Sequence, residues 1–234
     1  MQTVTLQKQN EHTDGSLTAT ALAANVVAVL GNARNETQPF KHWLFRNILP
    51  PAVCHDIIAL PIVPVAVADT YGKRDSHNDI RRFFSPAMQE QYPVMRLVAE
   101  AFQSEPVARA VEKLCSVRLK GSYLRVEYCQ DRDGFWLEPH MDIKEKFITM
   151  QLYLNTGVSA DKLGTDLYDN DKKPFSTAPS QLGEGMVFVP KEPNSWHGFE
   201  KRHIPDVRRS LIINYVTDDW RSCHELSFPE QKVS

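Results

Sequence analysis

Two histidines and one aspartate have the types and the spacing that a metal site requires. His140 and Asp142 are separated by one residue, so an extended chain places both side chains on the same side, where both can reach one ion. His197 can supply a third ligand from a later segment. Two imidazoles and one carboxylate on one face of a metal suit non-haem Fe(II) and leave coordination positions open for reactants. The sequence therefore predicts a catalytic metal centre at His140, Asp142 and His197.

The two other His-x-Asp triplets of the chain lie in less suitable contexts. His12-Thr13-Asp14 falls in a polar N-terminal segment, and His77-Asn78-Asp79 falls in a polar stretch that is expected to form a loop. Arg81-Arg82 follows the second triplet, and guanidinium groups would pair with its carboxylate rather than leave it to a cation. Only the triplet at 140–142 is flanked by segments of strand composition.

The third ligand is chosen by its position between two strand-like segments. His197 follows the apolar segment Gly185 to Val189 and precedes the one that begins near Leu211. A lone histidine in a strand is usually a structural residue, so the assignment depends on the whole constellation. His203 stands beside a proline turn and His224 in a polar C-terminal segment, and both are expected to be solvated.

An arginine and a serine in the last strand-like segment could hold an acidic group. Arg208 and Ser210 are two residues apart, so they lie on the same face of a strand. A guanidinium group and a hydroxyl group placed in this way can bind one carboxylate together. Arg209 should point the other way, toward solvent. Tyr153 could donate its phenol to the same carboxylate, although a tyrosine in a strand more often serves packing.

Helix-forming segments come first along the chain, and short strands follow. With 234 residues, 42% of them hydrophobic, the chain is long enough for one sizeable core. The expected helices cover 16–30, 50–60 and 86–116, the last range holding two helices divided near Glu105-Pro106. The expected strands cover 39–45, 117–129, 147–155, 165–168, 185–189, 195–199 and 209–216. This order predicts an α+β fold, mainly β, with a β-sandwich or small barrel buttressed by helices on one side.

The expected organisation is one domain with an extension. Residues 1–38 would form an N-terminal extension with a helix, and residues 39–234 a single domain whose metal-binding β core spans about 117–217. The apolar run at 21–31 is expected to be an ordinary helix, because acidic residues precede it instead of the short basic region of a signal peptide. Edge strands and the N-terminal helix would allow a homodimer.

The charge, hydrophobicity and cysteine pattern of the chain argue against nucleic acid and membrane as partners. The net charge of −2, with basic residues scattered among acidic ones, gives no overall electrostatic footprint for nucleic acid. No apolar stretch is long enough to span a membrane. The four cysteines show no C-x-x-C pairing, which favours idle thiols in a reducing, cytoplasmic compartment.

Taken in order, these motifs resemble a known family. The span from about residue 123 to 216 is similar to the Fe(II)- and 2-oxoglutarate-dependent oxygenases, particularly the prolyl-hydroxylase-like branch. The family pattern is H-x-D, Y-L-N, G-T or G-G, G-x-x-x-F, a distal H and R-x-S. In this chain it reads His140 to Asp142, Tyr153 to Asn155, Gly164-Thr165, Gly185 to Val189, His197, and Arg208 to Ser210.

The resemblance implies a double-stranded β-helix, a jelly roll of the cupin type, with iron at its mouth. If the residue roles of the family apply here, the triad would bind Fe(II). Arg208 and Ser210 would bind the distal carboxylate of the cosubstrate 2-oxoglutarate. Tyr153 and Thr149 would line the same pocket. Tyr128 falls where relatives often carry a cosubstrate-contacting tyrosine, with Arg125 on the opposite strand face as a rival.

The implied reaction consumes O₂ and 2-oxoglutarate and releases succinate and CO₂, most simply with hydroxylation of an unactivated C–H bond. Asp142 fills the position that halogenating relatives leave to halide, and desaturation or ring formation stays open. Mixed charge around the triad suits a small polar substrate such as an amino acid, a sugar or a biosynthetic intermediate. Arg82, Trp136 and Lys146 are candidate rim residues.

Three alternatives remain. A protein or peptide residue hydroxylase would use the same centre, because related folds modify peptides. A non-catalytic, cupin-like metal-binding module would need no carboxylate anchor, so Arg208 and Ser210 argue against it. A metal-dependent hydrolase lacks a convincing general base beside the triad.

Overall fold

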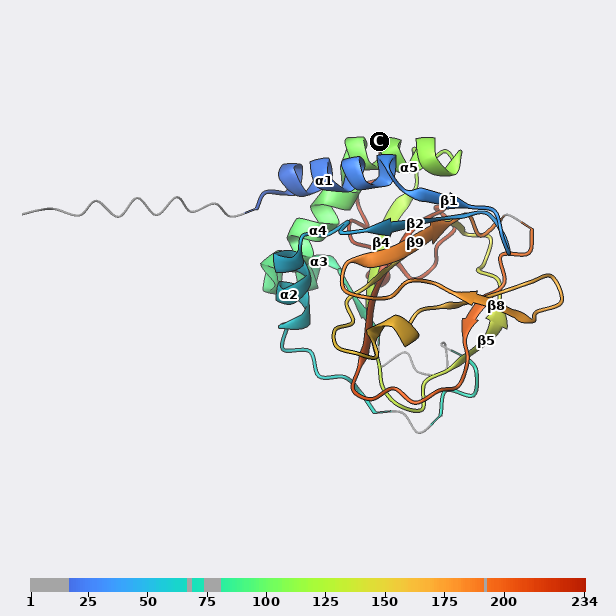
Figure 1. The fold of residues 1–234 in the computed structure, drawn as a ribbon. Helices are drawn as coiled ribbons and strands as arrows, with labels where there is room; N and C mark the ends of the chain where they lie inside the picture. Colours follow the sequence, from blue (N-terminus) through green and yellow to red (C-terminus); the bar gives the residue numbers. More distant parts are fainter. Residues whose placement is uncertain (1–16, 67–68, 74–80, 192) are drawn as a thin grey trace, which may run out of the picture.

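Two antiparallel sheets, formed by strands between residues 34 and 216, face each other (Figure 1). The computed structural model describes residues 17–66, 69–73, 81–191 and 193–234, and the triplets at 12–14 and 77–79 lie outside these ranges. The larger sheet has the strand order β1-β2-β9-β6-β11-β4-β3, and the smaller sheet the order β5-β10-β7-β8. The strands of the larger sheet are β1 (Arg34–Glu36), β2 (His42–Arg46), β3 (Arg81–Phe83), β4 (Tyr123–Asp131), β6 (Lys146–Tyr153), β9 (Glu184–Phe188) and β11 (Arg208–Val216). Those of the smaller sheet are β5 (Leu137–His140), β7 (Asp166–Tyr168), β8 (Pro174–Thr177) and β10 (His197–Phe199).

The helices of the described residues pack on the side of the larger sheet that faces away from the smaller one (Figure 1). They are α1 (Ala19–Gly31), α2 (Pro51–Ile58), α3 (Pro86–Gln91), α4 (Pro93–Gln103) and α5 (Glu105–Cys115), and the 3₁₀ turns η2 (Ala160–Lys162) and η3 (Cys223–Glu225) lie among the strands. Thr18 caps α1 by accepting a hydrogen bond from the Ala21 N–H at 3.2 Å. α1 then lies against α4 and α5, so the N-terminal helix belongs to the main core.

Proline sets the helix boundaries between residues 86 and 116. The expected division near Glu105 is confirmed, because α5 begins there. The expectation of only two helices is wrong: Pro93 starts α4 directly after Tyr92 and separates it from α3. Proline fits the first turn of a helix but cannot donate the backbone hydrogen bond that would continue the preceding one.

The central strand β11 separates the core from the cavity between the sheets. Leu211, Ile213 and Tyr215 point to the helices and are fully buried. The alternate residues Arg208, Ser210 and Ile212 line a cavity on the opposite face, as the two-residue period of a strand requires. A single strand thus anchors the fold with one face and supplies the site with the other.

The architecture confirms the expected α+β class: an antiparallel jelly roll supported by helices on one side.

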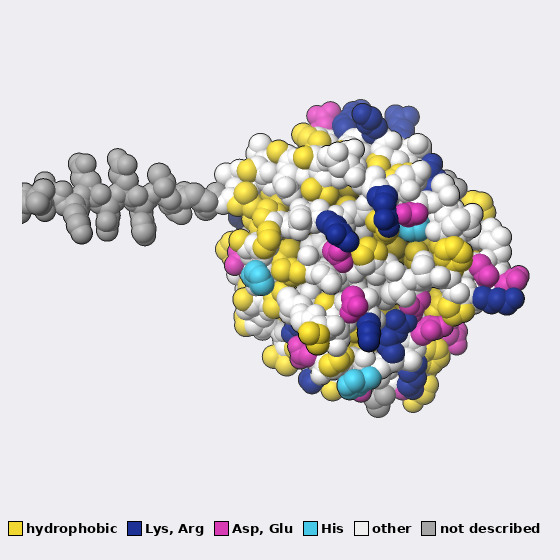
Figure 2. Space-filling model, viewed as in Figure 1, with side chains coloured by type: hydrophobic (Ala, Val, Ile, Leu, Met, Phe, Trp, Pro, Cys, Tyr) yellow, Lys and Arg dark blue, Asp and Glu magenta, His cyan; other side chains and the backbone are white. Residues whose placement is uncertain are grey.

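Among the described residues, no helix combines the length and apolar character needed to cross a bilayer. On the face shown in Figure 2, lysine and arginine side chains lie among aspartate and glutamate side chains.

Candidate metal centre and its cavity

The two sheets bring the predicted metal ligands together. His140 ends β5 and lies directly opposite His197 at the start of β10, which places the two imidazole centroids 4.4 Å apart. Asp142 reaches the same point from the loop between β5 and β6. One ligand atom from each of the three residues lies within 4.8 Å of the others.

Backbone carbonyl groups hold both imidazoles in the tautomer that a metal needs. The Nδ1 atom of His140 lies 2.9 Å from the Glu138 carbonyl oxygen, and Nδ1 of His197 lies 2.9 Å from that of Ser195. Since a carbonyl only accepts, each Nδ1 carries the proton and each Nε2 presents its lone pair. Burial and then the neighbouring His140 lower the pKa of His197 to about 4, which keeps its imidazole neutral near pH 7.

The carboxylate of Asp142 is held at both oxygens. Lys146 Nζ donates to Oδ1 at 2.5 Å, and the Thr149 hydroxyl donates to Oδ2 at 2.6 Å. Burial alone would raise the pKa of Asp142, but the Lys146 ammonium, His197 and these hydrogen bonds outweigh it and lower the pKa well below its usual range. Two imidazoles that present Nε2 and one ionised carboxylate form a donor set that fits Fe(II).

A cavity of about 1010 Å³ extends from the triad between the sheets. On one side of the triad its wall contains Thr149, Gln151, Thr165, Arg208 and Ser210. All five side chains come from residues at most 8% exposed. This end of the cavity is therefore a buried polar pocket with one cationic group.

Arg208 is fixed by three contacts. Its Nε donates to the Leu163 carbonyl oxygen at 2.7 Å, Nη1 lies 2.5 Å from Asp131 Oδ2, and Nη2 lies 3.3 Å from Thr165 Oγ1. The Phe199 ring covers the guanidinium at 4.6 Å. The group is thus pre-oriented, with Nη2 beside cavity-lining Thr165.

Tyr153 lies beside Arg208 without lining the cavity. Its ring centroid is 5.7 Å from the guanidinium carbon, and its hydroxyl lies 2.8 Å from Thr165 Oγ1 and 2.9 Å from Gln151 Oε1. The phenol therefore holds two cavity-lining side chains in place. Burial raises its pKa, so the hydroxyl stays protonated.

The expectation for Tyr128 is corrected. Tyr128 lies opposite Leu211 in the β4–β11 register and packs into the core beneath the helices. Neighbouring strand positions face opposite ways, so Arg125 and Glu127 line the cavity instead. The rival residue Arg125 is thus the one that lines the cavity, at the end away from Arg208.

Two of the three expected rim residues also lie elsewhere. Arg82 lies opposite Tyr128 and shares its face of the sheet. The preceding residue, Arg81, lies on the other face and lines the cavity. The Trp136 indole N–H donates to Asp69 Oδ1 at 2.5 Å and does not line the cavity. Lys146 does line it, beside Asp142.

The sequence analysis missed Asp131, Glu127 and Glu225, three acidic residues in or next to the cavity wall. Asp131 pairs with Arg208 because the antiparallel register places the two directly opposite each other. At the other end of the cavity, Arg81, Arg125, Glu127 and Glu225 form a buried ion-pair cluster. The alternation Arg125, Glu127, Cys129, Asp131 along a buried strand is the signal that could have identified this polar face.

These features define a jelly-roll protein in which one cavity connects a His-Asp-His centre with a buried arginine. No protein-family model matches the sequence, and no curated protein is significantly similar to it. Solved structures do share the fold. A prolyl 4-hydroxylase from Pseudomonas putida superposes with a TM-score of 0.53 at 18% identity, covering 84% of this chain and 94% of that one.

Two further structures support the same fold. A prolyl 4-hydroxylase from Phytophthora capsici gives a TM-score of 0.56 at 13% identity, covering 91% of this chain and 70% of that one. A prolyl hydroxylase from Trichoplax adhaerens, in complex with a peptide fragment of hypoxia-inducible factor, gives 0.55 at 14% identity, covering 86% and 91%. The chain therefore has the fold of the prolyl hydroxylases, as the sequence motifs predicted.

Proposed function

We propose that this protein is a 2-oxoglutarate-dependent non-haem iron dioxygenase that hydroxylates an unactivated C–H bond of a small polar molecule. One observation carries the proposal: a single cavity contains both the His-Asp-His triad and the buried guanidinium of Arg208. A metal site alone would not require a buried carboxylate anchor beside it. The fold shared with prolyl hydroxylases agrees with this function.

The residues present fit Fe(II) and 2-oxoglutarate. His140, Asp142 and His197 would hold the metal through two Nε2 atoms and one carboxylate oxygen. Arg208 and Ser210 would bind the distal carboxylate of the acid. The chemistry that Fe(II) supplies in such a site is O₂ activation coupled to decarboxylation of 2-oxoglutarate, giving succinate, CO₂ and one oxygen atom for the substrate.

The protein's own contribution is to position these groups and to exclude water. The carbonyl groups of Glu138 and Ser195 accept from the two Nδ1 atoms and keep both imidazoles aimed at one point. Phe199 covers Arg208, which strengthens the attraction between the guanidinium and a carboxylate by excluding solvent. Such fixed geometry lowers the entropic cost of bringing the reactants together.

The far end of the cavity favours a polar substrate. Arg81, Arg125, Glu127 and Glu225 present charges of both signs there. Hydroxylation of a peptide residue is the second candidate, because the similar solved structures are prolyl hydroxylases and one of them holds a peptide.

An anaerobic titration with Fe(II) and 2-oxoglutarate tests the proposal. We expect the weak visible charge-transfer band of a chelated 2-oxo acid, lost in His197→Ala. Succinate release in the presence of O₂ would then be screened against amino acids, sugars and peptides, which separates the two candidates. Iron-loaded protein that binds no 2-oxoglutarate would instead indicate a non-catalytic metal-binding module.

A further inference from the structure

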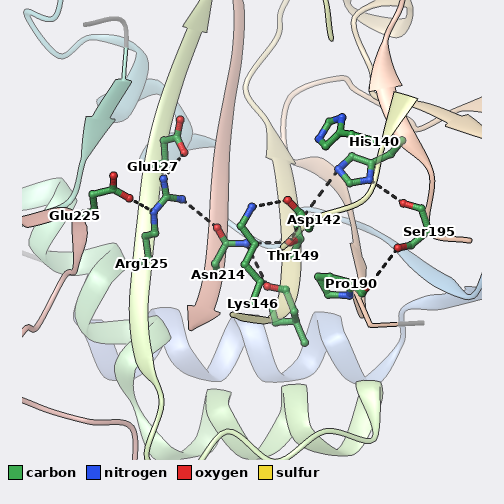
Figure 3. A network of polar contacts seen from close by, with 12 residues as sticks. Arg125, Glu127, His140, Asp142, Lys146, Thr149, Pro190, Ser195, Asn214 and Glu225 are labelled. Carbon is green, nitrogen blue, oxygen red and sulfur yellow. Dashed lines mark hydrogen bonds and ion pairs between the residues drawn. The ribbon is translucent and has the colours of Figure 1, made fainter. Parts of the chain in front are cut away.

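A chain of buried hydrogen bonds runs across the larger sheet to the metal ligand Asp142 (Figure 3). Arg125 Nη1 donates to Asn214 Oδ1 at 3.1 Å, and Asn214 Nδ2 donates to Thr149 Oγ1 at 3.0 Å. The Thr149 hydroxyl then donates to Asp142 Oδ2 at 2.6 Å. The first three residues are at most 1% exposed, so water does not compete for these bonds.

The direction of every bond in this chain follows from the two groups that flank the Asn214 amide. They are the Arg125 guanidinium and the Ile148 carbonyl oxygen, which accepts from Asn214 Nδ2 at 3.2 Å. A guanidinium has donors and no acceptor, so the Asn214 atom that faces it must be the carbonyl oxygen. The Asn214 amide nitrogen must then face Thr149, where it donates to the hydroxyl oxygen. Because a hydroxyl has only one proton, Thr149 is left to donate that proton to Asp142. Arg125 and the Ile148 carbonyl group thereby fix the direction of the third hydrogen bond of the chain, from Thr149 to Asp142.

Arg125 itself cannot reorient. Its Nε lies 2.6 Å from Glu225 Oε2, and its Nη2 lies 2.9 Å from Glu127 Oε2. The rings of Phe83 and Trp220 lie 4.7 and 5.2 Å from the guanidinium carbon. Ion pairs and aromatic rings from β3, β4, η3 and the segment before η3 therefore hold it.

The oxygen at the end of the chain is the one closest to the predicted metal position. Asp142 Oδ2 lies 3.9 Å from His197 Nε2, whereas Lys146 binds the other oxygen. The two hydrogen bonds fix the rotation of the carboxylate about its Cβ–Cγ bond from opposite sides. Lys146 has a long, flexible side chain, so its bond to Oδ1 constrains the carboxylate only weakly. The bond from Thr149 to Oδ2 is held by buried groups whose hydrogen bonds allow one orientation.

We propose that Arg125, acting through Asn214 and Thr149, positions the Asp142 carboxylate for metal binding. The inference rests on the proposed function, because it takes the triad to be the metal site. Arg125, Asn214 and Thr149 are positioning residues in it. Groups that orient a metal ligand typically change metal affinity about 10- to 100-fold when they are removed.

Asn214→Asp tests the direction of the bonds with almost no change of side-chain shape, although it also removes the donor to the Ile148 carbonyl oxygen. An aspartate at 214 can accept from both Arg125 and the Thr149 hydroxyl, so the hydroxyl proton turns away from Asp142. We expect the Fe(II) dissociation constant, measured anaerobically against a competing chelator, to rise about tenfold or more. Simple charge attraction predicts the opposite, since an added anion near a cation should tighten its binding.

Thr149→Val and Thr149→Ser complete the experiment. The valine variant removes the hydroxyl and should weaken Fe(II) binding to a similar extent, whereas the serine variant keeps the hydroxyl and should bind like the wild type. In the double variant Thr149→Val/Asn214→Asp, the aspartate should add little further loss, because the hydroxyl through which it acts is gone. The ligand-field absorption of bound Co(II) should shift in Asn214→Asp and Thr149→Val but not in Thr149→Ser.

Matched controls are Asn170→Asp and Thr156→Val, the same changes at exposed positions, and thermal unfolding verifies that each variant is folded. Unchanged or tighter metal binding in Asn214→Asp, or a full additional loss in the double variant, would overturn the inference alone. If His197→Ala binds Fe(II) as tightly as the wild type does, both the inference and the proposed function are overturned.

Discussion

Asp131 forms a buried ion pair with Arg208, with Oδ2 and Nη1 2.5 Å apart, behind the wall of the candidate cosubstrate pocket. The Asp131 side chain is fully buried and that of Arg208 nearly so. The pair explains how a guanidinium can be kept in a dry pocket before any ligand arrives, since an isolated buried charge is very costly. It also means that the carboxylate of an incoming acid shares Arg208 with a carboxylate of the protein.

Asp131→Asn should therefore weaken the fold and strengthen binding of 2-oxoglutarate. Removing one partner of a buried ion pair typically costs about 3–5 kcal/mol, and asparagine should lose less because it keeps an acceptor oxygen. The ligand then supplies the only carboxylate at Arg208 and meets less repulsion. We expect a lower Tm without ligand and a larger rise of Tm on adding 2-oxoglutarate than in the wild type. A smaller ligand-induced rise would contradict this account.

Arg208→Gln and Arg209→Gln form a matched pair on one strand. Glutamine at 208 can still donate to Asp131 but carries no charge, so 2-oxoglutarate binding should weaken by about 2 kcal/mol or more, roughly 30-fold. Arg209 has its nearest carboxylate partner in exposed Asp206, and its replacement should leave that affinity unchanged. Isothermal titration on metal-loaded protein measures both. Fe(II) affinity should stay unchanged in both variants, and equal losses of 2-oxoglutarate binding would contradict the assignment.

The sequence predicted the elements whose residue pattern is strong. The alternation in Phe147 to Asn155 and the apolar run Gly185 to Val189 correspond to β6 and β9. The short strands β1, β3, β5 and β8 were missed. β1 and β8 are largely exposed edge strands with polar composition and no alternation. Pairing with a neighbour, which is a tertiary effect, is what makes them strands.

The candidate metal ligands could be identified from the sequence, whereas the partners that fix them could not. A His-x-Asp triplet carries its geometry within three residues, and His140 and Asp142 could be identified locally. The contacts Asp131–Arg208 and Asn214–Thr149 depend on the register of β11 against β4 and β6. A one-residue change of register moves every side chain of a strand to the other face, and the sequence alone does not define that register for Tyr128 and Arg82.

His42 should make the stability of the metal-free protein depend on pH. Its side chain is buried, with Nδ1 2.8 Å from the Phe40 carbonyl oxygen, and burial lowers its pKa below the usual value. As the pH falls below about 6.5, the unfolded chain binds a proton here that the folded chain resists, so the free energy of unfolding decreases. Urea unfolding at a series of pH values should give a shallower decrease for His42→Gln than for the wild type. Parallel profiles would show that His42 is protonated equally in both states.

Gly164→Ala should disturb the cosubstrate pocket through the backbone. A Cβ atom at Gly164 would lie 1.9 Å from the Ala178 carbonyl oxygen, so the chain on either side must move. Its neighbours Leu163 and Thr165 both contact Arg208; their displacement should misplace the guanidinium. We expect weaker 2-oxoglutarate binding with Fe(II) affinity retained, because no metal ligand lies on this segment. Gly31→Ala is the matched control, since a Cβ there meets no atom within 4 Å; if Gly164→Ala binds the acid as the control does, Leu163 and Thr165 do not position Arg208.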